Sequence, residues 1–366
     1  MDTRRALAGL TDAAERATTG DELFEQVSTR LRKHVPFDGS AWFATDPATL
    51  LATLPVRVEN VEDGHCETYW EREYLVEDVL LFRDIARTET GVGTLADVTG
   101  GHLGRSTRHN EFLQPQGYDD ELRATMRAGS STWGVVSLFR DRGRARFDQD
   151  ETTLLRQLGP IIATGLRRLA LLESPPPTDQ DAPGTALYSI DGELISLDAQ
   201  AERWLNEFAG PDWMSKPVST SIMSATLARA RPGKEAGVQA AARLRTPAGR
   251  WLVLRASCLA SPSGVPTGLA LSVGPAKSSQ IAPIVVEAYG LTPRERQITE
   301  GVARGLSNAE MADQMFLSPY TVRDHLKAIF AKVGVGSRGE LVAKLFAEHY
   351  GPAMHADGQD GVHAFF

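Results

Sequence analysis

The sequence predicts a multidomain chain with two α+β parts followed by an all-α part of four short helices. The chain has 366 residues, which exceeds the usual size of a single domain. The stretch LLESPPPTDQDAPG, residues 171–184, contains four prolines, so neither a helix nor a strand would persist through it. A second, weaker break lies at residues 274–290. We therefore expect domains at residues 1–173, 178–276 and 285–350, with no evident internal repeat.

The amino-acid composition indicates the cellular compartment of the protein. Hydrophobic residues make up 42 % of it and charged residues 23 %, and no apolar run approaches the ~18 residues that span a bilayer. The start, MDTRRALAGLTDAAERATTG, has no apolar signal core. Cys66 and Cys258 are the only cysteines, which argues against a disulfide scaffold or a thiolate metal cluster. We expect a cytoplasmic protein with no membrane association and no bound metal.

Residues 1–173 read as a helix, a sheet and a closing helix. In GDELFEQVSTRLRKHV the apolar residues Leu23, Val27 and Leu31 fall on one helical face. GSAWFAT and STWGVVSLFRD are rich in apolar and β-branched residues and read as strands. A long helix, FDQDETTLLRQLGPIIATGLRRLALLE, then completes an α+β domain.

The order VPFDGSAWFATDPATLLAT, then WGVVSLFRDRGRARFDQDE before the last helix, resembles GAF domains of bacterial regulators. The resemblance implies a sensor that binds a cyclic nucleotide, haem, a tetrapyrrole or another small molecule, or one that only dimerises. The residues do not choose among these, so the cofactor stays unassigned.

Two sets of side chains in this domain are candidates for ligands. Trp42, Trp70 and Trp133 are candidates for lining an apolar pocket, because indole offers a large area and one donor; the alternative is that they fill the core. The histidines, including His65 and His109, have spacings that fit no metal-ligand pattern.

Residues 178–276 predict a second α+β domain. GTALYSIDGELISLDAQAERWLNEF reads as two strands joined at Asp191 and Gly192 and then a short helix, and AARLRTPAGRWLVLRASCL and TGLALSV add further antiparallel strands. This order resembles a PAS domain, with Asp198 where that family often has Asn. The part from Pro183 to Pro275 has no histidine, which disfavours a His-ligated haem, and it lacks the Asn-Cys-Arg run of flavin photosensors.

The last part carries dense helix signals. Thr292 with Glu295, Ser307 with Glu310, and Ser337 with Glu340 form capping boxes, and Ser318 followed by Pro319 makes a fourth helix start. Gly305 and Gly334 suit the left-handed position after a helix. Only residues 316–318 join the second helix to the third, which is the short turn of a helix-turn-helix unit.

The third helix has one apolar face and one polar face. Val322, Leu326, Ile329, Phe330 and Val333 follow helical spacing and should pack inward. The opposite side carries polar residues suited to bases and phosphates of the major groove: Thr321, Arg323, Asp324, His325 and Lys327. A solvated face is the alternative. The capped helices, the short turn and a local basic excess favour double-stranded DNA, although the whole chain has a net charge of −8.

The segment LTPRERQITEGVARGLSNAEMADQMFLSPYTVRDHLKAIFAKVGVGSRGELVAKL resembles the LuxR/NarL-type helix-turn-helix domain over almost its whole length. The resemblance implies that Arg323, Asp324 and Lys327 contact bases. It implies phosphate or neighbouring contacts for Thr321, His325, Lys332 and Arg338. The predicted DNA-binding set also includes Ser318 and Tyr320. The family usually has Lys where this chain has Arg323, so an operator preference does not transfer. A homodimer on a two-fold operator is also implied, through the fourth helix.

These parts together predict a one-component transcription regulator whose GAF-like and PAS-like sensors respond to a signal or a small-molecule ligand. The alternative is a response-regulator-like protein controlled by a partner protein; the acidic pair, phosphorylatable Asp and Lys of a receiver domain are not found. The chain has no G-x-x-x-x-G-K-[ST], G-x-S-x-G or H-E-x-x-H motif, and we expect no enzymatic activity.

Overall fold

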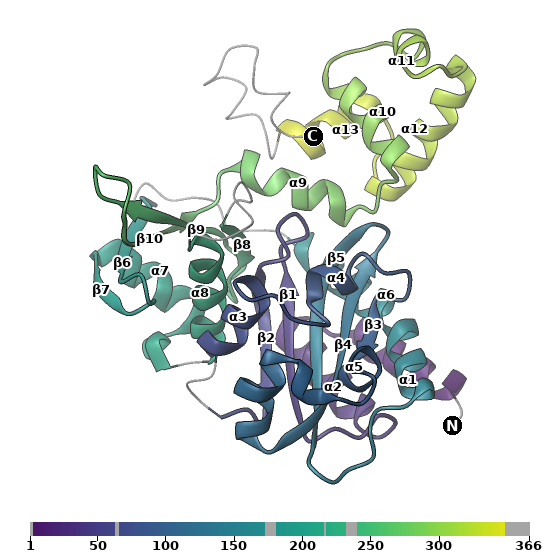
Figure 1. Cartoon of the computed structure of the whole chain (residues 1–366). Coiled ribbons are helices and arrows are strands. Elements are labelled where there is room, and N and C mark those ends of the chain that lie inside the picture. Colours follow the sequence, from purple (N-terminus) through teal and green to yellow (C-terminus); the bar gives the residue numbers. More distant parts are fainter. Residues whose placement is uncertain (1–2, 63–65, 173–180, 216, 232–239, 348–366) are drawn as a thin grey trace. The chain divides into compact units, whose positions relative to one another are not determined.

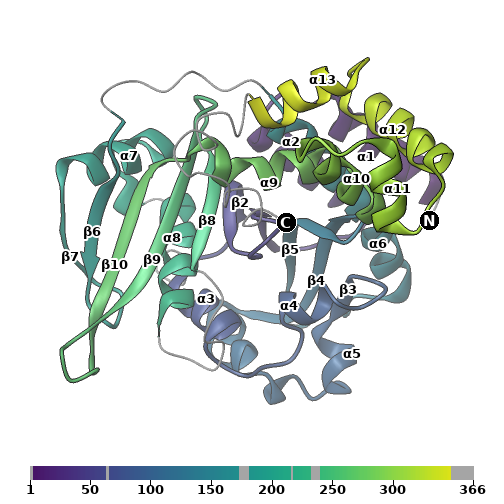
Figure 2. The ribbon, with the colours of Figure 1, turned by 90° about the horizontal axis from the view of Figure 1, so that it is seen from above.

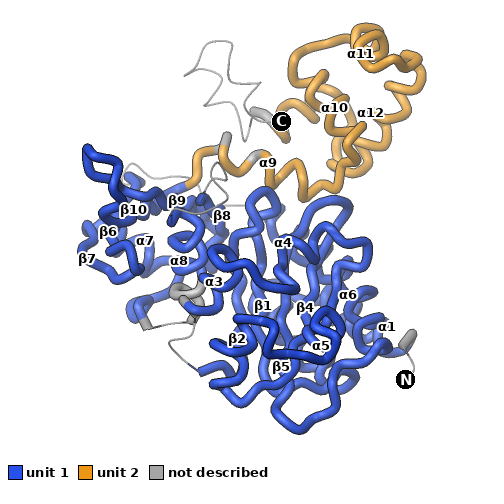
Figure 3. The backbone as a smooth tube through the Cα atoms, viewed as in Figure 1, with its two compact units in different colours: residues 1–275 blue, residues 276–366 orange. Residues whose placement is uncertain are grey.

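The computed structural model describes residues 3–62, 66–172, 181–215, 217–231 and 240–347. Its contacts divide the chain into two compact units, residues 1–275 and residues 276–366 (Figure 3). Most of the predicted proline-rich linker, and His65, lie outside the described residues. None of the described helices combines the length and the apolar character needed to cross a bilayer.

The first half of unit 1 is a five-stranded antiparallel sheet with the order β2-β1-β5-β4-β3 (Figure 1). Its strands are β1 (Gly39–Thr45), β2 (Ala52–Glu59), β3 (Val92–Thr94), β4 (Tyr118–Ala128) and β5 (Ser131–Asp141). Three helices cover one face (Figure 2): α1 (Thr3–Arg16), α2 (Gly20–Leu31) and α6 (Gln149–Ala170). Two shorter helices, α3 (Cys66–Tyr74) and α4 (Phe82–Ile85), lie on the other face, with α5 (Leu95–Thr99) at the β3 edge. The expected α+β architecture is confirmed.

The second half of unit 1 is another five-stranded antiparallel sheet, with the order β7-β6-β10-β9-β8. Its strands are β6 (Gly184–Tyr188), β7 (Leu194–Leu197), β8 (Ala241–Arg245), β9 (Trp251–Ala260) and β10 (Pro266–Pro275). The helices α7 (Ala199–Ala209) and α8 (Pro217–Ala230) pack against it. Along β6 buried and exposed residues alternate, so one face of the sheet is covered and the other is open. The α+β prediction holds here as well.

The two sheets have the same topology. Counted from the first strand of each sheet, the spatial order is second, first, fifth, fourth, third in both. The sequence has no evident repeat because the two halves conserve only the order in which strands pair, while their side chains, helices and connections differ.

One hydrophobic cluster contains buried residues from both sheets of unit 1. It contains Phe43 and Trp70 from the first half and Trp204 and Leu254 from the second. Helix α3 packs against α8 at the junction. Unit 1 is therefore one packed body rather than two parts joined only by chain.

Unit 2 is all-α, as the sequence predicts. Its helices are α9 (Ser278–Ala288), α10 (Pro293–Ala303), α11 (Asn308–Met315), α12 (Pro319–Val333) and α13 (Arg338–Val342). The boundary between the two units, after Pro275, falls within the break that the sequence indicates at residues 274–290, and the rest of that stretch forms the helix α9. Buried Ile284, Val285 and Val286 explain the helix, because their packing outweighs the hydrogen bond that Pro283 cannot donate.

The core of unit 2 confirms the predicted inward face of the third helix. Val322, Leu326, Ile329 and Val333 are buried against apolar residues of α10 and α11 such as Ile298. The polar side of α12 is thereby directed away from the core.

Candidate nucleic-acid interface

Side-chain caps set the starts of the helices in unit 2. The cap residues are Thr292, Ser307, Ser318 and Ser337, and each accepts a hydrogen bond from the backbone N–H three residues later. The first two capping boxes are complete, as predicted. In the third, Glu340 accepts from the N–H of Gly336 rather than from that of Ser337. The predicted stops are confirmed, since Gly305 and Gly334 have φ of 77° and 71°.

The start of α12 is held by Ser318. Its Oγ accepts from the N–H of Thr321 at 3.0 Å and lies 2.8 Å from Thr321 Oγ1, while Pro319 occupies the first helical position. The first turn of α12 is thus fixed independently of any partner, and the side chains that project from it are held on a rigid support.

Seven of the nine predicted DNA-binding residues lie together on the outward side of α12. Five are exposed and two are partly exposed, and they are Ser318, Tyr320, Thr321, Arg323, Asp324, His325 and Lys327. The guanidinium carbon of Arg323 lies 4.7 Å from the centre of the Tyr320 ring, a cation–π contact. Lys327 Nζ lies 3.7 Å from Asp324 Oδ1 in a solvent-exposed pair, which is weak enough to exchange for contacts to a phosphate or a base.

The segment that carries this arrangement matches a known protein family. Residues 290–345 match the family model described as bacterial regulatory proteins, luxR family. Residues 290–345 are a luxR-family domain. The match covers all of α10, α11, α12 and α13.

Curated proteins are similar to parts of this chain. A putative HTH-type transcriptional regulator of Mycobacterium bovis is 48 % identical over 52 residues, which is 14 % of this chain and 6 % of that protein. The probable HTH-type transcriptional regulator GfsR of Streptomyces halstedii is 27 % identical over 165 residues, which is 45 % of this chain and 61 % of that protein. The chain therefore spans less than two thirds of either relative.

Among solved structures, the cyanobacteriochrome TePixJ GAF domain is similar to part of the chain. It is 16 % identical with a TM-score of 0.33, and the match covers 43 % of this chain and 96 % of that one.

The two remaining residues of the predicted DNA-binding set hold the luxR-family domain together. Lys332 Nζ donates to Glu295 Oε2 at 2.6 Å and to the carbonyl of Gly290 at 3.3 Å. Arg338 donates to Asn308 Oδ1 at 3.2 Å and to the carbonyl of Leu306. Their partners lie in or next to other helices, α10 and α11. No local pattern distinguishes these cations from those on the outward face.

The pKa of Glu295 reflects this internal contact. Burial opposes its ionisation, but the hydrogen bonds from Lys332 and Thr292 outweigh burial and hold the pKa below its ordinary value. Glu295 therefore remains ionised and serves both the start of α10 and Lys332.

In unit 1 the structure does not bring the three candidate tryptophans to one pocket. Trp42, Trp70 and Trp133 are 0 %, 1 % and 4 % exposed. The centre of the Trp42 ring lies 5.9 Å from that of Phe24 of α2, on the face of the first sheet that α1, α2 and α6 cover. Trp70 of α3 packs 4.9 Å from Phe43, which follows Trp42 in β1 and so points to the opposite face.

The α3 face of the first sheet holds a buried ionic network that the sequence did not suggest. Arg123 donates to Glu121 Oε1 at 2.9 Å, to Glu73 Oε2 at 2.7 Å and to Tyr69 Oη at 2.9 Å. Arg108 donates to Glu121 Oε2 at 2.9 Å. The alternation of charged and apolar residues in DDELRATMR predicts a strand with one polar face, but it does not say that α3 covers that face.

Electrostatic interactions favour the charged forms of Glu121 and Arg123 in this network. Burial would raise the pKa of Glu121, yet Arg108 and Arg123 outweigh it and lower that pKa. Burial likewise opposes the charge of Arg123, while Glu121 raises its pKa. The charged groups of Arg108, Glu121, Arg123 and Glu73 and the Tyr69 hydroxyl thus hydrogen-bond to one another, whereas the buried indole N–H of Trp70 has no partner in the described structure.

The histidines of unit 1 form no metal centre in the described residues, where no group of three or more His, Cys, Asp or Glu is placed to hold an ion. His109 is buried; its Nδ1 lies 3.3 Å from Asn110 Oδ1 and its Nε2 lies 3.8 Å from Asp119 Oδ1.

Proposed function

We propose that the chain is a transcription regulator that binds double-stranded promoter DNA by inserting α12 into the major groove. The observation that carries the proposal is the cluster of seven outward polar residues on α12 of a luxR-family domain. An α-helix fits the major groove in width, and the first turns of such a helix reach the base edges.

Each outward residue has a chemical role in this proposal. Arg323 reads a guanine through its planar fork, and its contact with Tyr320 reduces the freedom that it loses on binding. Asp324 accepts from a cytosine amino group, and Lys327 exchanges Asp324 for a phosphate or a base. Ser318, Thr321 and His325 contact the backbone near the helix start.

The leading unit is proposed to modulate this binding. A signal received by residues 1–275 would change the dimer state or the accessibility of α12 and so the occupancy of the promoter. A homodimer on a two-fold operator fits this scheme.

One observation favours control by a partner protein or by dimerisation over a ligand held inside the first sheet. On the α3 face of that sheet Arg123 is buried and bonded to Glu121, Glu73 and Tyr69. A ligand there would have to displace a buried, fully paired cation, which is costly. The second sheet is compatible with control by a ligand and with control by a partner protein.

The test is genome-wide selection of DNA fragments by the purified chain, repeated with residues 276–366. Recovery of one two-fold motif by both would support DNA reading by the luxR-family domain and a modulating role for unit 1. Recovery by the full chain alone would mean that unit 1 supplies the dimer. If neither selects a motif, the proposed function is wrong.

A further inference from the structure

The open face of the second sheet is poor in charge. Helices α7 and α8 pack against the other face, and residues of β6, β9 and β10 alternate between buried and more exposed positions. Arg255 is the only charged residue in these three strands. An antiparallel sheet face that stays in water is ordinarily polar, so this one is suited to packing against a partner. Its other side chains are small or aliphatic and include Thr185, Leu187, Val253, Ser257, Leu259, Ala270 and Ser272.

Three exposed aliphatic side chains gather on this face. Leu187 is 37 %, Leu259 40 % and Ile195 65 % exposed. The register places Leu187 opposite Ala270 of β10, and Ile195 is the extra residue of the bulge where β7 pairs with β6. Leu259 lies diagonally beyond Ala270, because Ala270 is opposite Ser257. We name Leu187, Ile195, Leu259 and Ala270 the aliphatic strip. A contiguous group of this kind marks an interaction surface, whereas aliphatic side chains exposed singly do not.

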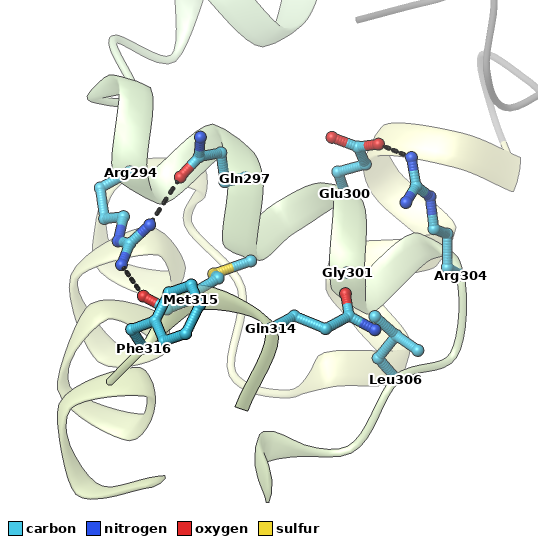
Figure 4. A pocket seen from close by; sticks show the side chains of 9 residues that line it. All are labelled: Arg294, Gln297, Glu300, Gly301, Arg304, Leu306, Gln314, Met315 and Phe316. Atoms are coloured by element: carbon cyan, nitrogen blue, oxygen red, sulfur yellow. Dashed lines mark hydrogen bonds and ion pairs between the residues drawn. The ribbon is translucent and has the colours of Figure 1, made fainter. Parts of the chain in front are cut away.

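Neither the edges of the sheet nor the pocket in unit 2 offers a better place for a partner. The edge strand β7 has only four residues and a bulge, which are ordinary protections against an added strand. The other edge strand, β8, contacts β2. The pocket lined by α10 and α11 is mostly polar, and its arginines are already bonded, Arg294 to Gln297 and Arg304 to Glu300 (Figure 4). The open face is therefore the stronger candidate.

The charges at the two margins of the aliphatic strip are unpaired within one chain. Among the described residues, neither the exposed guanidinium of Arg255 nor the exposed carboxylate of Glu193 has an ion pair or a side-chain hydrogen bond. Glu193 lies opposite Ser189, whose N–H donates to its carbonyl, in the turn from β6 to β7. Arg255 lies on β9, in the row of Thr185. A strand spacing of ~4.8 Å and a rise of ~3.4 Å per residue put Arg255 and Glu193 about 20 Å apart, with the aliphatic strip between them.

A second copy of the chain complements this face. In a two-fold contact, residue i of one copy contacts residue j of the other, and residue j of the first contacts residue i of the second. The midpoint between Arg255 and Glu193 falls near Leu187 and Ala270. A two-fold axis there, lying between the two faces, brings Arg255 of each copy to Glu193 of the other and packs the aliphatic strips together. The two sheets then cross at nearly a right angle, which is one of the preferred arrangements of sheets packed face to face.

Other occupants match this face less well. A nucleic acid would be attracted by Arg255 alone and opposed by the exposed carboxylates of Asp191 and Glu193. A different protein would have to supply both signs of charge at this spacing, which a second copy of the chain already does.

We propose that the open face of the second sheet is the interface of a homodimer, with the aliphatic strip at its centre and two pairs of Arg255 with Glu193 at its margins. The proposal rests on the proposed function only for the need of a dimer on DNA. It deepens that function by giving the dimer a surface outside the luxR-family domain.

Charge reversal tests the pairing. Arg255→Glu brings two carboxylates together at each margin and Glu193→Arg brings two guanidiniums together, so each change should weaken the dimer about tenfold or more. The double variant with both changes restores opposite charges and should recover most of the affinity. Sedimentation equilibrium of the full chain without DNA, at low and at high salt, measures the dissociation constant. High salt should weaken the wild-type dimer and reduce the differences among the variants.

Leu187→Lys tests the aliphatic strip. It places a charge without a partner at the centre of the interface and should leave the chain monomeric. Val98→Lys, at a side chain that is 44 % exposed on α5, is the matched control and should dimerise like the wild type. Thermal unfolding of every variant verifies that the folds are equal, which we expect because all four substituted positions are exposed.

The outcomes separate the interface from the proposed function. A monomeric wild type would overturn the interface, and so would a dimer that Leu187→Lys and the single charge reversals leave unchanged, because another surface would then hold it. A double variant no tighter than the single reversals would overturn the pairing of Arg255 with Glu193. A wild type that dimerises but selects no DNA fragment would count against the proposed function alone. A wild type that selects DNA but stays monomeric without it would count against the interface alone.

Discussion

Lys332 Nζ lies 2.6 Å from Glu295 Oε2, and this contact ties the end of α12 to the start of α10. The side chain of Glu295 is 5 % exposed and that of Lys332 is 35 % exposed, so the pair is only partly screened by water. Lys332 thus stabilises the luxR-family domain by an internal contact. It is not one of the seven outward polar residues of α12.

Replacing Lys332 by Met should destabilise this domain. The change leaves a buried carboxylate without its charged donor, which costs about 1–3 kcal/mol in free energy of unfolding. Urea unfolding of the full chain, followed by a probe in unit 2, measures the effect. Lys327→Met is the control, since Lys327 is 70 % exposed and should change stability little. Equal free energies of unfolding for the two variants would show that the contact between Lys332 and Glu295 does not stabilise the domain.

The lowered pKa of Glu295 predicts a pH dependence. A carboxyl group with a lower pKa in the folded state stabilises the fold above its unfolded pKa, about 4.3 for Glu, and loses that contribution as pH falls through the folded pKa. Glu295→Gln, which keeps the capping pattern, should show a smaller loss of stability below about pH 4.3 than the wild type. The measurement is the free energy of unfolding between neutral and acid pH. Parallel curves for the two proteins would contradict the prediction.

Arg323→Ala tests base reading. If Arg323 contacts a base, the change should cost about 1–3 kcal/mol of binding free energy and relax the preference at one base pair. Fluorescence anisotropy with the selected operator and its single-base variants measures both effects. A uniform loss across sequences would make Arg323 a phosphate contact. Tyr320→Phe keeps the ring beneath the guanidinium and should retain affinity better than Tyr320→Ala.

Arg123→Met should disrupt unit 1. It leaves Glu121 and Glu73 buried without this cation, which typically costs about 3–5 kcal/mol. Arg16→Met, at a side chain 74 % exposed in a pair with Asp12, should cost under about 1 kcal/mol. Chemical denaturation compares them. Similar losses in both variants would mean that the network does not support the fold.

Asp46 and Arg243 provide a test of the junction between the two sheets. Asp46 accepts from Arg243 Nε and Nη2 at 2.6 Å each, and its carboxylate is fully buried. Asp46→Ala should destabilise both halves of unit 1 together, by about 3–5 kcal/mol, because Arg243 loses its bidentate partner. Tryptophan fluorescence and circular dichroism during denaturation measure it. Separate transitions already present in the wild type would show that the halves unfold independently.

The luxR-family domain was predictable because its signals are local. The caps at Thr292, Ser307 and Ser318 and the stops at Gly305 and Gly334 act within one helical turn, and the spacing of Val322, Leu326 and Ile329 assigns the inward face of α12. The outward position of Arg323 and Lys327 follows from the same spacing, since a side chain that is not on the packed face of a surface helix points to solvent.

Contacts between distant segments were not predictable in this way. The sequence alone determined helix starts, strand character and the polar side of α12, because these depend on residues a few positions apart. Only the tertiary structure brought Lys332 and Arg338 to partners in or next to α10 and α11, covered Arg123 with α3, and packed the two sheets into one core, because each needs a partner 30 or more residues away. The pairing of such residues depends on the path of the whole chain, which no local pattern encodes.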